Sequence, residues 1–290
     1  MSTKSQNDVG KDFDKYAKEW AEQGYELEVK AADGTLLGRE NSAEVRVPGD
    51  EWGRQLDLEN LYRAFFNKYA PGPFSLLEIG SGGGRLSEVI ARGYGPQIHD
   101  YHTLDASAEM TNVLKKRIEN TGVSFTHHIG GSANLDELPQ DYFTFIFSQS
   151  CWSHISLYDQ YLYLRDLRKV ISVEGILMVN GVFLLGGQND WGWNRFRRRV
   201  AQKEQNASGV YHEFTGSYAT IEMALRLGWE VIAITNQAFI MRFRHAKKDV
   251  MFDKWADVPS NRKEVVFAPS LMAFLDKGRG KKRSIDFIQA

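Results

Sequence analysis

The sequence predicts an α/β protein with a Rossmann-like, seven-stranded, mostly parallel sheet, helices on both faces, an antiparallel last strand and an N-terminal helical cap. Short apolar runs alternate with segments of helical period from Phe74 to about residue 245, the pattern of a parallel sheet covered by helices. The first apolar run leads into a glycine-rich turn, where such sheets bind ligands. With 290 residues, 42% hydrophobic and 25% charged, the chain resembles an ordinary globular protein that buries a core.

One core domain with an extension at each end is expected. The boundaries are a cap over residues 1–70, a core over 71–250 with an insertion at 186–216, and an extension over 251–290. Residues 11–29 are amphipathic and predict a helix lying over the sheet edge. A second helix over Leu58–Tyr69 leads into the first strand.

The first half of the core reads as strand, helix, strand, helix. The first strand covers Phe74–Ile79, a helix begins over Leu86–Arg92, and His102–Leu104 end the second strand. Ser107 is a good N-cap for the next helix, which extends to Glu119. The apolar stripe of this helix contains Met110, Val113, Leu114 and Ile118.

The second half continues the alternation and ends in a strand pair. Further strands are expected over 123–129, 142–147, 176–182, 229–234 and 238–243. The helix before the fifth strand is predicted to bury one face formed by Leu157, Tyr161, Leu164 and Ile171. A later helix is marked by Tyr218, Ile221 and Leu225, and Gly228 ends it.

Composition and charge exclude several classes of protein. The formal net charge of −1 gives no global field for nucleic acid or an anionic membrane. Cys151 is the single cysteine, so the chain has no pair for a disulfide, zinc or redox motif, which fits a cytoplasmic protein. The apolar window that begins at Gly175 is interrupted by Asn180 and is shorter than the ~20 residues of a membrane span.

The glycine-rich turn lies in "LLEIGSGGGRLSEVI", residues 76–90. A strand that enters such a turn and then a helix brings backbone N–H groups to the carboxyl edge of the sheet. The dinucleotide fingerprint G-x-G-x-x-G requires a glycine at 85 or 87, where the chain has Arg85 and Ser87. Both registers therefore disfavour a nicotinamide or flavin dinucleotide.

Glu78 followed by Gly80, Gly82 and Gly84 resembles motif I of the class I methyltransferases that use S-adenosylmethionine, E-x-G-x-G-x-G. Asp105 ends the second strand, where that family carries a second carboxylate. The segments "FIFSQSCWSHI", "DLRKVISVEGILMVNG" and "LRLGWEVIAIT" resemble later segments of the same family, in the same order. The similarity covers roughly residues 74–245 and implies this fold with S-adenosylmethionine as cofactor.

The resemblance also implies a set of cofactor-binding residues. Asp105 is expected to accept hydrogen bonds from the ribose hydroxyls; the alternative is a plain helix N-cap. Ser132 stands where the family usually has an acidic residue, so backbone groups near Ser132 and Ala133 are expected to hold the adenine. The complete set is Glu78, Gly80, Ser81, Gly82, Gly84, Asp105, Ala106, Ser132, Ala133 and Gln149.

Candidates for catalysis and acceptor binding follow the fourth strand and the insertion. His154 and His212 are candidate general bases, because histidine titrates near neutrality. The alternatives are a structural histidine at a helix start and a capping loop. Candidate acceptor-binding residues are Trp152, Trp191, Arg195 and Glu213, and the alternative for the basic run 195–199 is a solvated helix face. The pairs His99/His102 and His127/His128 lack a partnering carboxylate cluster, so no metal is predicted.

The predicted function is methyl transfer from S-adenosylmethionine, EC 2.1.1.-, to an O or N atom of a small molecule such as a sugar, natural product or metabolite. Binding to nucleic acid or membrane is not expected, and a homodimer is left open. Two alternatives remain: a nucleotide-dependent oxidoreductase on the same type of sheet, and a non-catalytic methyltransferase-like binding protein.

Overall fold

A computed structural model of the chain describes residues 6–23, 55–69, 72–180, 183–184, 197, 215–234 and 238–243. The helices are α1 Gln6–Gln23, α2 Gln55–Tyr69, α3 Arg85–Tyr94, α4 Ala108–Ile118, α5 Leu157–Val170 and α7 Ser217–Arg226. The main strands are β1 Phe74–Ile79, β2 Ile98–Asp105, β3 Phe125–Ile129, β4 Phe143–Ser148, β5 Ile171–Asn180, β8 Trp229–Ile234 and β9 Ala238–Phe243. Short 3-10 helices are η4 Gly95–Gln97, η5 Ser132–Glu137 and η6 Trp152–His154, and a small strand pair is β6 Phe183–Leu184 and β7 Thr215–Gly216.

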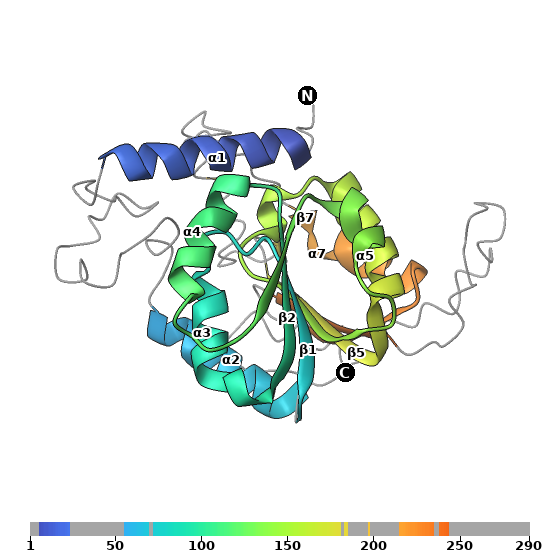
Figure 1. Cartoon of the computed structure of the whole chain (residues 1–290). Coiled ribbons are helices and arrows are strands. Elements are labelled where there is room, and N and C mark those ends of the chain that lie inside the picture. The colour runs from blue at the N-terminus through green and yellow to red at the C-terminus, as the bar shows by residue number, and fades with distance from the viewer. Residues whose placement is uncertain are drawn as a thin grey trace, which may run out of the picture.

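Seven strands form one sheet in the order β3-β2-β1-β4-β5-β9-β8. β1 is parallel to β2 and β4, whereas β9 is antiparallel to β5 and β8 (Figure 1). The predicted fold class, including the antiparallel last strand, is confirmed. No helix in the described ranges is long and apolar enough to cross a membrane.

Helices cover both faces of the sheet and bury its strands. All six residues of β1 are buried, as expected for a central parallel strand. Leu76 belongs to the cluster that packs under α2 and α3, whereas Leu77 belongs to the cluster under α5 and α7. The alternation of β1 side chains therefore fills two cores, one on each face.

The helix α5 buries a different face from the one predicted. Leu157 and Tyr161 are 41% and 38% exposed, and Ile171 begins β5 instead of ending the helix. The buried face contains Gln160, whose Nε2 donates to the carbonyl oxygens of Trp152 at 3.2 Å and Ile155 at 3.0 Å. Because a polar residue occupies a core position, the apolar spacing alone gave the wrong phase. Tyr163, Leu164 and Leu167 complete the buried face.

The helix α7 also departs from its predicted stripe. Ile221 is buried as expected, but Leu225 is 42% exposed, and Ala224 takes the buried position beside it. A small residue fits where a helix packs closely on the sheet, which the hydrophobic pattern does not reveal.

The chain order creates a crevice at the carboxyl ends of β1 and β4. The crossover from β1 to β2 runs through α3, and that from β4 to β5 runs through α5, on the opposite face. Such a topological switch point is where open α/β sheets bind ligands. Figure 1 shows α1 lying across this end of the sheet, so the predicted N-terminal cap includes a helix over the binding edge.

Between β3 and β4 the described chain forms only the short helix η5.

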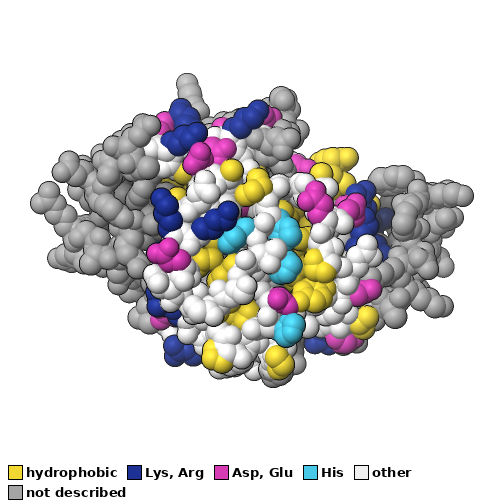
Figure 2. All heavy atoms as spheres, viewed as in Figure 1, with side chains coloured by type: hydrophobic (Ala, Val, Ile, Leu, Met, Phe, Trp, Pro, Cys, Tyr) yellow, Lys and Arg dark blue, Asp and Glu magenta, His cyan; other side chains and the backbone are white. Residues whose placement is uncertain are grey.

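Histidine side chains gather on the face of the molecule seen in Figure 2. The structure pairs His102 with His128 across the strands, with 3.1 Å between Nδ1 and Nε2, and does not pair the chain neighbours considered above. Among the residues with described positions, no group of three or more His, Cys, Asp or Glu side chains is arranged to hold a metal ion.

Most of the predicted insertion 186–216 and all of the extension 251–290 lie outside the described residues. Trp191, Arg195, His212 and Glu213 fall there, so their predicted roles are not addressed by the structure.

Candidate active site

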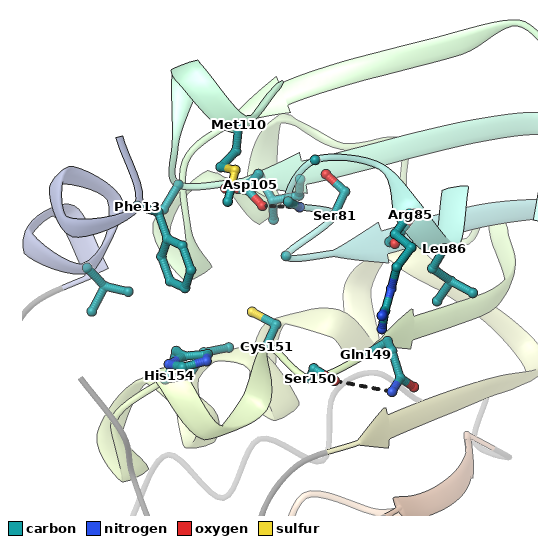
Figure 3. Close-up of a pocket in the computed structure, with 18 of the residues that line it drawn as sticks. Phe13, Ser81, Arg85, Leu86, Asp105, Met110, Gln149, Ser150, Cys151 and His154 are labelled. Atoms are coloured by element: carbon teal, nitrogen blue, oxygen red, sulfur yellow. Dashed lines mark hydrogen bonds between the residues drawn. The ribbon is translucent and has the colours of Figure 1, made fainter. Parts of the chain in front are cut away.

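A cavity opens at the carboxyl ends of β1, β2 and β4, beneath α1 (Figure 3). The empty space within the cavity and its open mouth is about 950 Å³. Seven of the ten predicted cofactor residues line it: Glu78, Gly80, Ser81, Gly82, Asp105, Ala106 and Gln149. The crevice predicted from the topology is therefore an open cavity with the expected residues in its wall.

Two features require glycine at the first position of the turn: its backbone conformation and the close approach of a neighbouring side chain. Gly80 has φ +70°, a conformation that L side chains rarely adopt. A Cβ atom at this position would lie 2.1 Å from Sγ of Cys151. Gly80 therefore lets the loop after β4 close against the loop after β1.

Gly84 serves helix packing. It has φ +80°, is the N-cap of α3, and a Cβ atom there would lie 2.9 Å from Cγ of Leu114 on α4. Gly84 does not line the cavity, so its glycine is explained by the close approach of two helices, and the predicted cofactor contact is not seen.

Glu78 holds the turn from inside the protein. Its side chain is 2% exposed, and Oε2 accepts hydrogen bonds from Oγ of Ser87 at 2.6 Å and from the Tyr101 hydroxyl at 2.7 Å. Burial raises the pKa of Glu78 to about 7, although the two hydrogen bonds act in the opposite direction. The predicted role as a buried organising carboxylate agrees with this geometry.

Asp105 joins the two loops that enclose the cavity. Its Oδ2 accepts the backbone N–H of Gly82 at 2.7 Å, and its Oδ1 accepts that of Ser107 at 2.8 Å. Burial raises the pKa of Asp105, while these two backbone hydrogen bonds lower it. Ser107, not Asp105, caps α4, since Oγ of Ser107 accepts the N–H of Met110 at 3.0 Å. The plain N-cap alternative for Asp105 is therefore wrong.

His154 lines the cavity from the loop after β4. Its side chain is 7% exposed, and its backbone N–H donates to the carbonyl oxygen of Cys151 at 2.7 Å. The ring of Phe13, from α1, meets the His154 ring edge-on, with 5.3 Å between centroids. Figure 3 shows these two rings facing each other across one end of the cavity.

Besides Gly84, three predicted site residues do not line the cavity. Trp152 is 1% exposed and packs in the core against Tyr163, so its predicted role in acceptor binding is wrong. Trp152 directly follows a residue of the cavity wall, but the turn of η6 directs its side chain into the core. Ser132 is buried in η5 and Ala133 is exposed, and neither belongs to the cavity wall as described.

Comparison with known proteins supports the fold and finds a family match over part of the chain. A family model described as a methyltransferase domain matches residues 76–175. Residues 76–175 are therefore similar to a methyltransferase domain. The seven-stranded sheet is that of the class I enzymes, whose methyl donor is S-adenosylmethionine. No curated protein matches the sequence.

Solved structures share this fold at low sequence identity. The YcgJ protein of Bacillus subtilis is 16% identical with a TM-score of 0.50, covering 62% of this chain and 71% of that one. The PH0226 protein of Pyrococcus horikoshii is 14% identical with a TM-score of 0.52, covering 68% and 92%. A Haemonchus contortus phosphoethanolamine N-methyltransferase structure, solved with S-adenosylhomocysteine, is 20% identical with a TM-score of 0.47, covering 61% and 39%.

The helix α1 forms a roof over the methyltransferase cavity. Val9 and Phe13 line the cavity, and a Cβ atom at Gly10 would lie 2.5 Å from the carbonyl oxygen of Ala106. Oδ1 of Asp14 accepts hydrogen bonds from Oγ of Ser107 at 2.6 Å and from the N–H of Glu109 at 3.1 Å. Asp14 therefore anchors the roof to the first turn of α4, where a negative charge is favourable.

Replacing Asp14 with alanine is expected to loosen this roof. Loss of the two hydrogen bonds at the start of α4 should lower the free energy of unfolding by about 1 kcal/mol. The rate of S-adenosylhomocysteine release should rise several-fold, because α1 supplies part of the cavity wall. Stopped-flow release and denaturant unfolding measure the two effects. Asp8→Ala on the same helix is the control, and an Asp14→Ala release rate equal to the control's would contradict the anchoring role.

Cys151 is the cavity's only thiol, and the chain's single cysteine. Burial raises its pKa to about 12, so the thiol stays protonated near neutrality and does not act as a nucleophile.

We therefore expect slow alkylation of Cys151 by iodoacetamide at pH 8. The native protein should react at least tenfold more slowly than the unfolded chain, because only the thiolate attacks and the thiol is largely buried. Mass spectrometry of timed samples measures both rates. Native and unfolded chains reacting at the same rate would show that the thiol is ionised and accessible.

Several wall residues were not identified from the sequence. They are Val9, Phe13, Gly83, Arg85, Leu86, Leu104, Met110, Gly130, Ser150, Cys151, Ile155 and Tyr163. Arg85 directly follows the recognised motif and could have been included. Phe13 gives no such signal, because its amphipathic segment does not reveal which structure it covers.

Proposed function

We propose that the chain transfers the methyl group of S-adenosylmethionine to an O or N atom of a small-molecule acceptor. One observation carries this proposal: a single cavity extends from Asp105 and the glycine turn to His154 and Phe13. A donor held at the first group would share its space with an acceptor beside the second. The roof formed by α1 favours a small acceptor over a folded macromolecule.

The residues present suit S-adenosylmethionine. Asp105 offers carboxylate oxygens at the cavity wall for the ribose hydroxyls, and Gly80 and Gly82 leave the backbone accessible to the methionine end. The bound cofactor supplies an activated methyl group on its sulfonium. The protein then mainly aligns the acceptor and excludes water.

His154 is proposed as the general base for a hydroxyl acceptor. A proton lost from the acceptor as it attacks would pass to the imidazole, a step typically worth about 10²–10⁴-fold in rate. The rings of Phe13 and His154 would also hold water away from the attacking atom. An amine acceptor that arrives unprotonated needs this base less. His212 and the acceptor residues Trp191, Arg195 and Glu213 remain predictions from the sequence.

A different argument disfavours each of the two alternative functions. Dinucleotide-binding oxidoreductases of the Rossmann type use a parallel sheet, whereas β9 is antiparallel here. A non-catalytic binding protein would not need a base beside the donor site. We therefore favour catalysis, and from the single cysteine and the near-zero net charge we propose a cytoplasmic protein that does not bind nucleic acid. A homodimer remains open.

Two experiments test this function. Calorimetric titration of the full chain with S-adenosylhomocysteine and with NAD should show binding of the first only; binding of NAD alone would refute the proposal. A panel of hydroxyl and amine metabolites with S-adenosylmethionine should yield S-adenosylhomocysteine with at least one acceptor. For a hydroxyl acceptor, His154→Gln should lower kcat about 100-fold, whereas exposed His99→Gln should leave it unchanged.

A further inference from the structure

The charged side chains of the cavity wall come from one part of the fold. Among the lining residues that the structure describes, the Asp, Glu, Lys and Arg side chains are those of Glu78, Arg85 and Asp105. Glu78 lies in β1, Arg85 begins α3 directly after the glycine turn, and Asp105 ends β2. The charges therefore lie on the elements at which the proposed function places the methyl donor.

The order of the strands separates two ends of the cavity. β3, β2, β1 and β4 are neighbours in this order. Gly130, directly after β3, donates its N–H to the carbonyl oxygen of Asp105 at 2.8 Å, so the wall at β2 continues toward β3. His154 and Ile155 follow β4, on the other side of β1. A donor with its ribose at Asp105 and its amino-acid arm at Gly80 would leave the wall after β4 for the acceptor.

We call this part of the wall the acceptor end. It consists of Phe13 from α1, Cys151, His154 and Ile155 from the segment after β4, and Tyr163 from α5. In Figure 3, Phe13 and His154 lie at the end of the cavity remote from Arg85. Apart from the imidazole of His154, the acceptor end is formed mainly by rings, an aliphatic side chain and a thiol.

The acceptor end is fixed by the core behind it. Ile155 is buried, and its carbonyl oxygen accepts a hydrogen bond from Nε2 of Gln160 at 3.0 Å. Tyr163 is also buried, and its ring centroid lies 6.1 Å from that of Trp152. Side chains packed in this way do not move aside to let water follow a charged group into the cavity.

A charged acceptor finds no opposite charge among the described residues of the acceptor end. The Cys151 thiol is neutral, because burial raises its pKa to about 12. Asp14, next to Phe13, accepts hydrogen bonds at the start of α4 and does not line the cavity. His154 must be neutral to accept a proton, so as a base it offers no charge to an anion. Because an unpaired charge away from water is costly, carboxylate, phosphate and ammonium groups near the reacting atom are disfavoured.

We propose that the acceptor is an uncharged, largely apolar hydroxyl compound of the phenol type, whose ring lies against Phe13, Ile155 and Tyr163 with its hydroxyl beside His154. An aromatic ring suits this wall, because rings pack edge-on or offset against one another. The inference rests on the proposed function, since it takes S-adenosylmethionine as the donor and His154 as the base.

The reaction of such an acceptor balances without a further reactant. The hydroxyl oxygen would form a bond to the methyl carbon while the carbon–sulfur bond breaks and its electron pair stays on sulfur. The hydroxyl proton would pass to the imidazole of His154. The products are a methyl ether and S-adenosylhomocysteine.

The test compares three phenols that share the reacting hydroxyl. 3-Ethylphenol is uncharged, 3-(aminomethyl)phenol has an ammonium group in place of the terminal methyl group, and 3-hydroxybenzoate has a carboxylate at the same ring position. Calorimetric titration of the full chain saturated with S-adenosylhomocysteine measures their affinities, and formation of S-adenosylhomocysteine from S-adenosylmethionine measures kcat/KM. Both values for 3-ethylphenol should exceed those for each charged phenol by at least about tenfold.

Phe13→Lys tests whether the apolar wall sets this preference. Phe13 is half-buried, so a lysine there would bring a flexible cation to the acceptor end. The preference for 3-ethylphenol over 3-hydroxybenzoate should fall about fivefold or more, whereas Phe13→Leu, which stays apolar, should retain it. Glu19→Lys is the matched control. Glu19 is 49% exposed on the same helix and does not line the cavity, so this variant should keep the wild-type preference.

Three results would overturn the inference: equal or tighter binding of a charged phenol, binding of none of the three phenols to the complex with S-adenosylhomocysteine, or a wild-type preference in Phe13→Lys. A wild-type protein that does not bind S-adenosylhomocysteine would instead refute the proposed function. The comparison of the three phenols uses the wild type, so it remains decisive if Phe13→Lys does not fold.

Discussion

Asp105→Ala is expected to weaken S-adenosylhomocysteine binding by about 100-fold or more. Hydrogen bonds to a charged group are each worth about 1.5–3 kcal/mol, and the carboxylate is expected to accept two from the ribose hydroxyls. Two such bonds correspond to at least two factors of ten in the dissociation constant. Calorimetric titration of the full chain measures the change directly.

Part of the Asp105→Ala effect would come from the protein. The same carboxylate holds the N–H groups of Gly82 and Ser107, so its removal also loosens the turn. Asp105→Asn keeps the size and one acceptor oxygen, and its affinity should lie between those of the wild type and the alanine variant. Asp100→Ala, on the same strand but outside the cavity wall, is the control. An Asp105→Ala affinity equal to the control's would refute the ribose role.

Glu78 is expected to make the ligand-free protein less stable as the pH rises from about 4.5 to about 7. The pKa of the Glu78 carboxyl is 4.5 in the unfolded chain and about 7 in the folded protein. Between these pH values the carboxyl loses its proton in the unfolded chain but keeps it in the folded protein. Ionisation of the unfolded state then favours unfolding, and the slope ends near pH 7. At about 1.36 kcal/mol per pKa unit, the free energy of unfolding should fall by ~3 kcal/mol.

Glu78→Gln isolates this contribution. The amide oxygen can still accept hydrogen bonds from Ser87 and Tyr101, but the side chain does not titrate. Denaturant unfolding at pH 4.5, 6, 7 and 8 should show the variant gaining about 3 kcal/mol relative to the wild type as the pH rises. Other titrating groups are shared and cancel in this difference. Exposed Glu174→Gln should show no such trend, and a constant difference for Glu78→Gln would contradict the raised pKa.

The fold could largely be predicted because it is encoded in local patterns. The strand 74–79 and the pair 229–234 and 238–243 were predicted with the observed boundaries, since short, mostly apolar runs between turn residues are typical of buried strands. The phase of α5 could not be read in this way. Its buried Gln160 is satisfied by the carbonyl oxygens of Trp152 and Ile155, which only the folded loop brings within reach.

The candidate site likewise contains residues that local motifs predict and residues whose roles depend on the folded structure. Glu78, Gly80, Gly82 and Asp105 follow from short motifs, because their conformations depend on residues next to them and on the strand ends. The expectation for Trp152 was wrong because adjacent side chains in a turn point in different directions. The side chain next to the cavity wall therefore lies in the core. Gly84 belongs to the motif, but its missing side chain makes room for Leu114, where the helices α3 and α4 pack together.

By itself the sequence determined the sheet, the glycine turn and the two carboxylates that identify a methyl-donor site. These depend on periodicity, on backbone conformations open to glycine and on residues near one another in the chain. Only the tertiary structure decided that α1 roofs the cavity, that Phe13 faces His154, and that Ile155 and Tyr163 line the same cavity. These contacts join residues from separate elements, and their positions are set by packing in the folded core rather than by any local pattern.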